Sequence, residues 1–128
     1  RLAYGGHSGS RGGAVATVEE APGEACPVVV HRMSDRDLRT LDACEGFRAF
    51  GRSFYDRRRM IVRRDIDGWD MEALVYVLAR PWINIPTRHY HKTIEAGYIA
   101  HGFDLLHLDN ALRRAIRTVA ALEMDHES

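Results

Sequence analysis

Short runs of apolar, β-branched residues alternate with turn-forming residues through much of the chain, and this pattern predicts strands. The runs cover residues 14–18, 26–32, 55–64 and 71–79. Asp67 and Gly68 lie between the last two runs and favour a tight hairpin turn there. The Gly- and Ser-rich segment 5–13 is expected to be a flexible turn between strands, because no Gly-Lys-Ser/Thr follows it to make a phosphate-binding loop.

Other segments carry the apolar spacing or the capping residues of helices. The expected helices cover residues 34–45, 87–101 and 105–124. Ser34 followed by Asp37 is typical of a capping box, and Gly46 is a natural stop for that first helix. Thr87 is the expected cap of the second helix. Strands joined by hairpins, with helices between and after them, predict an α+β fold with an antiparallel sheet.

Glu45 stands where packing alone would not place a carboxylate. On the first expected helix, Leu38 and Leu41 mark the apolar stripe, and Glu45 falls between them in projection. A carboxylate on a core-facing stripe is costly to desolvate, and the negative end of the helix dipole should raise its pKa. A glutamate of this kind suits general base catalysis near neutral pH. The alternative is that Glu45 lies in a frayed last turn and points to water.

Composition narrows the function classes. Eighteen basic and eighteen acidic side chains cancel, so the chain has no general attraction to nucleic acid or to an anionic membrane. No apolar run approaches the roughly 20 residues that span a bilayer. Cys26 and Cys44 do not make a disulfide framework, which favours a reduced, cytoplasmic protein. A length of 128 residues predicts one domain over residues 1–128. Its oligomeric state is open, and a homodimer is compatible with the sequence.

Three other kinds of site were weighed and are not favoured. His89 and His91 are two residues apart, so on a helix they point in different directions, and we expect no metal and no other cofactor. Cys44 has no histidine near it in sequence to activate a thiol nucleophile. The arginine-rich run 57–64 beside Tyr55 could hold single-stranded nucleic acid. The acidic residues around this run favour a solvated, salt-bridged hairpin instead, so no nucleic-acid partner is expected.

The order of several segments identifies a family. They are GGAVATV (12–18), CPVVVHRMSDRDLRTLDACEGF (26–47), YDRRRMIV (55–62), EALVYVL (72–78) and IPTRHYHKTIEAGYIAHGF (85–103). In this order they resemble the γ-glutamylcyclotransferase-like (AIG2-like) family over about residues 1–105. In that family a short helix ends in Leu-Asp-x-x-Glu-Gly, and a Pro-Ser-x-x-Tyr segment opens a later helix. Here the second motif appears as Pro86 to Tyr90.

The resemblance implies a fold, a reaction and a set of site residues. The fold is a small, strongly curved, barrel-like antiparallel sheet with flanking helices. The reaction is cyclisation of a small-molecule γ-glutamyl substrate to 5-oxoproline, with Glu45 as the catalytic acid/base and no metal or organic cofactor. Gly46, Tyr55 and Tyr90 would contact the substrate. From the residues alone, the two tyrosines could equally belong to the core.

One departure from the family pattern bears on activity. Family members open with a strand and a Tyr-Gly-Ser-Asn type loop, whose backbone N–H groups hold the substrate. The segment from Tyr4 to Ser8 imitates this loop only superficially, since it stands a few residues before Gly12 and Gly13 instead of several tens of residues away. Residues 1–4 are therefore expected to match the strand after the loop, in a fragment, a processed form or a branch without the loop. The alternative function is a non-catalytic AIG2-like binding or interaction module with an incomplete pocket.

Overall fold

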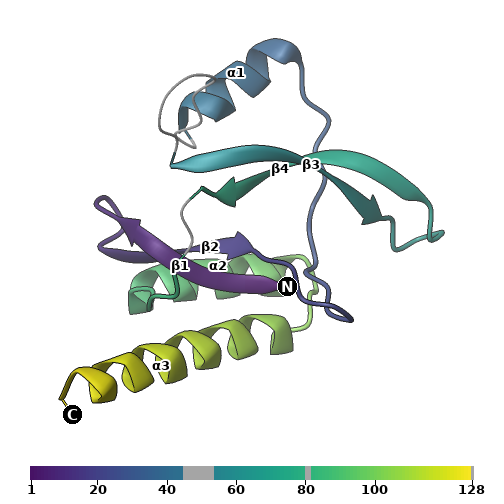
Figure 1. The fold of residues 1–128 in the computed structure, drawn as a ribbon. Coiled ribbons are helices and arrows are strands. Elements are labelled where there is room, and N and C mark those ends of the chain that lie inside the picture. The colour runs from purple at the N-terminus through teal and green to yellow at the C-terminus, as the bar shows by residue number, and fades with distance from the viewer. Residues whose placement is uncertain (45–53, 80–81, 128) are drawn as a thin grey trace. The chain divides into compact units, whose positions relative to one another are not determined.

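The computed structural model describes residues 1–44, 54–79 and 82–127 (Figure 1). Its elements are β1 (Leu2–Ser8), β2 (Gly13–Val18), α1 (Asp35–Cys44), β3 (Tyr55–Arg63), β4 (Asp70–Leu78), α2 (Arg88–Ala100) and α3 (Leu106–Glu127). The chain divides into two compact units, Arg1–Pro27 with Arg80–Ser128, and Val28–Ala79. The described residues form two small antiparallel sheets and three helices, which confirms the α+β class.

The first unit is built on the hairpin of β1 and β2. The pairing runs from Leu2 opposite Val18 to Ser8 opposite Gly13, with an irregularity after Gly5. Strand β1 therefore continues through the first four residues of the segment 5–13 that was expected to be a flexible turn, and that expectation was wrong for Gly5 to Ser8. The turn that reverses the chain is confined to residues 9–12. It is closed by a hydrogen bond of 2.8 Å from the N–H of Gly12 to the carbonyl of Ser8.

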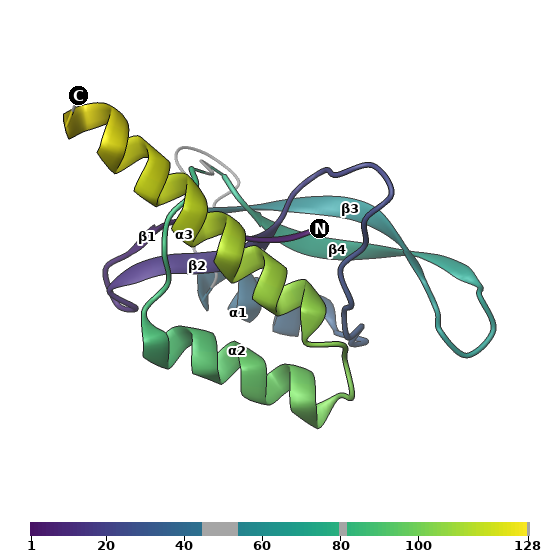
Figure 2. The same ribbon diagram turned by 90° about the horizontal axis from the view of Figure 1, so that it is seen from below.

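Helices α2 and α3 lie on the same face of this hairpin (Figures 1 and 2). The buried core between them consists of Leu2, Tyr4, Ala14, Tyr98, Leu108, Ala111 and Ala115. The three α3 residues of this set are spaced by three and four positions, so they form one stripe along the helix. Tyr4 and Leu108 are 1% and 0% exposed, and burying a side chain of this size contributes about 1.5–3 kcal/mol.

The segment that precedes α2 binds both strands of this hairpin. The N–H of Gly6 donates to the carbonyl of Trp82 at 2.8 Å, and the N–H of Ala14 donates to the carbonyl of Ile85 at 3.2 Å. A Cβ atom added at Gly13 would lie 3.1 Å from the Ile85 carbonyl oxygen and 3.2 Å from the backbone nitrogen of Thr87. Only glycine allows this approach without displacing backbone, which gives Gly13 of the GGAVATV segment a physical reason.

The second unit is the hairpin of β3 and β4 with α1 on one face (Figure 1). The strands pair in unbroken register from Tyr55 opposite Leu78 to Arg63 opposite Asp70. Gly68 in the turn has φ +69°, a conformation that other residues adopt at a cost. This confirms the hairpin that the sequence predicted, within one residue at its ends.

The helix predictions are also confirmed, with ends that differ by one to three residues. The Ser34 hydroxyl accepts a hydrogen bond from the N–H of Asp37 at 3.1 Å, which is the expected N-terminal cap of α1. The Thr87 hydroxyl accepts a hydrogen bond from the N–H of Tyr90 at 3.2 Å and caps α2.

The predicted strand 26–32 was wrong. Residues 25–34 belong to no helix, strand or turn in the described part of the chain. Val28, Val29 and Val30 are between 42% and 46% exposed. A β-branched run favours an extended backbone, but a strand also needs a neighbouring backbone to pair with, and Pro27 has no N–H to offer. The described strands accordingly form two separate sheets, and closure into one barrel-like sheet is not seen among them.

We predict that Gly13→Ala destabilises the protein by about 1–3 kcal/mol, because the new methyl group meets backbone atoms that cannot turn away. The measurement is the free energy of unfolding from urea titration. Gly97→Ala is the matched control: nothing lies within 4 Å of the added Cβ there, and alanine in mid-helix should stabilise by about 0.5–1 kcal/mol. Equal effects of the two substitutions would show that the contact with residues 85–87 is not close in solution.

Candidate active site

The face of α1 that meets the hairpin carries two leucines and one carboxylate. Leu38, Leu41 and Asp42 are half-buried, and the other described residues of α1 are exposed. The apolar stripe predicted from Leu38 and Leu41 therefore lies on the protected side of the helix. Asp42 shares this side because it stands four positions after Leu38.

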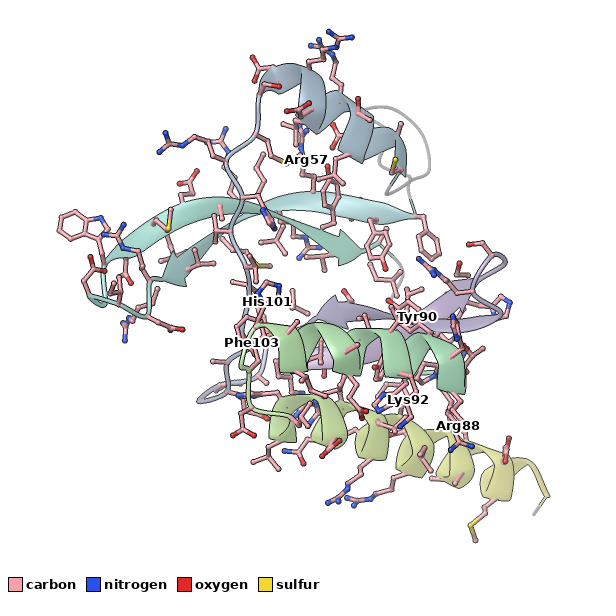
Figure 3. The ribbon with its side chains drawn as sticks, turned by 180° about the vertical axis from the view of Figure 1, so that it is seen from behind. Arg57, Arg88, Tyr90, Lys92, His101 and Phe103 are labelled. Atoms are coloured by element: carbon pink, nitrogen blue, oxygen red, sulfur yellow. The ribbon has the colours of Figure 1, made fainter. Side chains whose placement is uncertain are left out.

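Both oxygens of the Asp42 carboxylate are bound from the hairpin. Nη1 of Arg57 donates to Oδ2 at 2.7 Å, and the hydroxyl of Tyr76 donates to Oδ1. Arg57 and Tyr76 are direct cross-strand partners, and Figure 3 shows Arg57 pointing from β3 toward α1. Charged donors and acceptors in a partly desolvated setting form stronger hydrogen bonds than neutral ones. The side chains of Asp42 and Arg57 are 16% and 28% exposed, so this ion pair is sheltered from solvent.

Sequence reasoning missed Asp42. The available signal was a second carboxylate on the apolar stripe, within the Leu-Asp-x-x-Glu-Gly motif. Its partners lie 15 and 34 residues away along the chain, and no local pattern connects them.

Glu45 and Gly46, the predicted acid/base and one predicted substrate contact, lie outside the described residues. Their predicted roles therefore remain predictions. The structure does describe what precedes them: α1 ends at Cys44, and Asp42, three residues before Glu45, is tied to the hairpin.

Tyr55 is the first residue of β3 and lies in the second unit. It is half-buried, pairs with Leu78 across the hairpin, and meets Phe54 edge to face with ring centroids 5.0 Å apart. Tyr55 and Arg57 are two positions apart, so both side chains emerge on the face of the hairpin that binds α1. This placement is compatible with the predicted pocket role of Tyr55.

Tyr90 lies on α2 of the first unit, and its hydroxyl has a structural partner. It accepts a hydrogen bond from the N–H of Ala16 at 3.0 Å, and Figure 3 shows the residue pointing from α2 toward β2. Its ring meets Tyr4 edge to face with centroids 6.3 Å apart, and the Arg11 guanidinium lies 5.6 Å from its centroid. Tyr55 and Tyr90 belong to different units, and their sharing of one substrate pocket stays a prediction.

Tyr4 and His91 form a buried polar pair next to Tyr90. The Tyr4 hydroxyl and Nδ1 of His91 are 3.0 Å apart, and Nε2 of His91 is 3.9 Å from a carboxylate oxygen of Glu95. Burial raises the pKa of the Tyr4 phenol above its ordinary range, so the hydroxyl stays protonated. Tyr4 thus serves the core of the first unit and not a substrate loop. Within the described ranges, no cluster of three or more His, Cys, Asp or Glu residues could hold a metal ion.

Three arginines of the β3–β4 hairpin form ion pairs with acidic residues of the same hairpin, as the sequence predicted. Arg59 binds Glu72 at 3.2 Å, and Arg64 binds Asp67 within the turn. Arg63 binds Asp70 at 3.4 Å. These pairs are exposed, and each contributes little to stability. They confirm the salt-bridged hairpin.

The comparisons with known proteins identify the family. A family model described as "Gamma-glutamyl cyclotransferase, AIG2-like" matches residues 4–112. The α+β fold agrees with this match, and the chain belongs to that family. No curated protein and no solved structure gave a match. None of the helices that the structure describes is long and apolar enough to cross a bilayer.

We predict that Tyr90→Phe costs about 0.5–1.5 kcal/mol, because it removes the hydrogen bond that fixes α2 to β2. The measurement is the free energy of unfolding. Tyr98→Phe is the matched control from the same helix. The Tyr98 hydroxyl is buried, and its neighbour is the Cys26 thiol, a weak hydrogen-bonding group, so its removal should be close to neutral. If Tyr90→Phe is as neutral as the control, the bond to Ala16 contributes nothing to stability, and a pocket role for the hydroxyl becomes more credible.

Proposed function

We propose that this chain cyclises a γ-glutamyl group to 5-oxoproline and releases an amine or an amino acid, with Glu45 as the general acid/base. The family match over residues 4–112 is the observation that carries the proposal. The position of Glu45 in the family's Leu-Asp-x-x-Glu-Gly motif, directly after α1, supports the assignment of its role.

The reaction is intramolecular, so it needs few catalytic groups from the protein. The α-amine of the γ-glutamyl group attacks the γ-carbonyl carbon, and a C–N bond forms to close the five-membered lactam. Glu45 takes a proton from the attacking nitrogen and returns one to the leaving nitrogen as the original amide bond breaks. The protein must hold the substrate folded on itself, because proximity is already supplied by its own chain. No oxidant or other co-reactant is consumed.

Substrate contacts by Gly46, Tyr55 and Tyr90 are part of the same proposal. Tyr55 is supported by its place on the hairpin face that also binds α1. Tyr90 has weaker support, because its hydroxyl already binds the backbone of β2. This bond is the observation that favours the alternative function, a non-catalytic AIG2-like module, in which Tyr90 only stabilises the fold.

We predict that Glu45→Gln lowers kcat/KM for 5-oxoproline release by at least about 10²-fold, because the amide cannot act as a base. The assay uses the full-length protein that contains this chain. The substrates are a panel of γ-glutamyl dipeptides and γ-glutamyl amines, and product is measured by chromatography.

The matched control is Glu72→Gln, an exposed carboxylate of the same hairpin that is paired with Arg59, and this variant should keep the parent's kcat/KM. A Glu45→Gln protein as fast as its parent would exclude Glu45 as the base. A parent without any 5-oxoproline release over the panel would overturn the enzymatic function, and calorimetric binding of γ-glutamyl compounds would then test the binding-module function.

A further inference from the structure

We propose that Asp42 is a positioning residue: its carboxylate, held by Arg57 and Tyr76, fixes the end of α1 and so places Glu45. This inference rests on the proposed function for its catalytic consequence, but not for its structural part. The described contacts, and not the family match, carry it.

The geometry of the contact is that of an anchor. Arg57 donates a hydrogen bond to one oxygen of the Asp42 carboxylate and Tyr76 donates to the other, so both the position and the orientation of the carboxylate are fixed. Both donors come from directly opposed positions in the hairpin, whose register is unbroken over the whole length of β3 and β4. The end of α1 is thus fixed to the most regular part of the second unit.

Helix stability does not account for Asp42. Asp35 and Asp37 stand in the first turn of α1, where the helix dipole favours carboxylates, and no basic residue stands in its last turn. Asp42 stands near the last turn, where the dipole opposes a negative charge. Arg57 neutralises this charge from another element. The ion pair of Asp42 with Arg57 therefore stabilises the contact between the end of α1 and the hairpin, whereas the negative charge of Asp42 by itself destabilises the helix.

The other ion pairs of the hairpin differ from this one. The side chains of Arg59 and Arg63 are 77% and 76% exposed, against 28% for Arg57 and 16% for Asp42. Exposed pairs contribute little, whereas removing one partner of a sheltered pair is strongly unfavourable. Arg59, which emerges on the same hairpin face and binds Glu72, therefore provides a matched control.

The anchor is close to Glu45 in the sequence. Asp42 stands three residues before it, and three residues span at most about 11 Å even in a fully extended chain. A displacement of about 1 Å in a reacting group can cost on the order of 10² in rate. The charges of the anchor are also close enough to influence the ionisation of Glu45 at low ionic strength.

The first test does not depend on activity. Hydrogen exchange followed by mass spectrometry is measured on the complete gene product for the peptide from Leu41 to Phe47, in the parent, Asp42→Asn and Arg59→Gln proteins. We expect exchange in this peptide to be at least 10-fold faster in Asp42→Asn and unchanged in Arg59→Gln. Unchanged exchange in Asp42→Asn would overturn the anchor whether or not the protein is an enzyme. If Asp42→Asn does not fold, Tyr76→Phe, which removes the donor to one oxygen only, takes its place with the same expectation.

The second test measures how the charges of Asp42 and Arg57 change the pH at which kcat/KM falls on the acidic side (the acidic limb) of its pH profile. Glu45 must be ionised to act as a base. Asp42→Asn removes a negative charge and leaves Arg57 in place, so the limb should move to lower pH, and Arg57→Gln should move it to higher pH. The double substitution should return it close to the parent's position. Shifts on the order of 0.3–0.6 pH unit are expected for charges about 10 Å away at low ionic strength.

The value of kcat should also fall, by about 10-fold or more in Asp42→Asn, with a smaller change in KM, and stay unchanged in Arg59→Gln. Limbs that do not move in opposite directions, together with kcat within twofold of the parent, would overturn the positioning role. A parent that releases no 5-oxoproline would instead overturn the proposed function and leave the exchange experiment as the test of the anchor.

Discussion

The Asp42 carboxylate, bound by Arg57 and Tyr76, is the interaction on which the second unit depends. Helix α1 has no fully buried residue, so apolar burial alone holds it weakly. Leu38 and Leu41 are half-buried and hold the helix without fixing its exact position. The sheltered ion pair fixes how far α1 is shifted along its axis and how it is rotated about that axis. A short helix of ten residues is marginal by itself, so its place on the hairpin is decided by these few contacts.

The first unit is held together differently. Its core is apolar, and close backbone approach at Gly13 allows the segment before α2 to bind both strands of the hairpin. Thr87 then caps α2, and Tyr90 in its first turn binds back to β2. Gly13 and the segment from Pro86 to Tyr90 meet in this arrangement, so both contribute to the fold of the first unit.

The sequence predicted those elements whose signals are local. The caps at Ser34 and Thr87 and the Asp67–Gly68 turn each act within a few residues, and each is found in the structure. The run 26–32 was predicted as a strand because extended backbone is also a local preference, but pairing needs a partner that no local pattern specifies. Asp42 was missed for the same reason. Its partners are distant in the chain, and its importance becomes visible only when the hairpin faces α1. Glu45 was found from the motif that follows the same helix, and its role is still a prediction.

The account centres on a glutamate delivered to the reacting nitrogen by the end of a docked helix. The most direct measurement is a crystal structure of the complete gene product with 5-oxoproline bound. We expect the Glu45 carboxylate at hydrogen-bonding distance, about 3 Å, from the ring nitrogen of 5-oxoproline, with Asp42 still bound to Arg57. A structure in which the product binds elsewhere, with Glu45 beyond the reach of its nitrogen, would contradict the account.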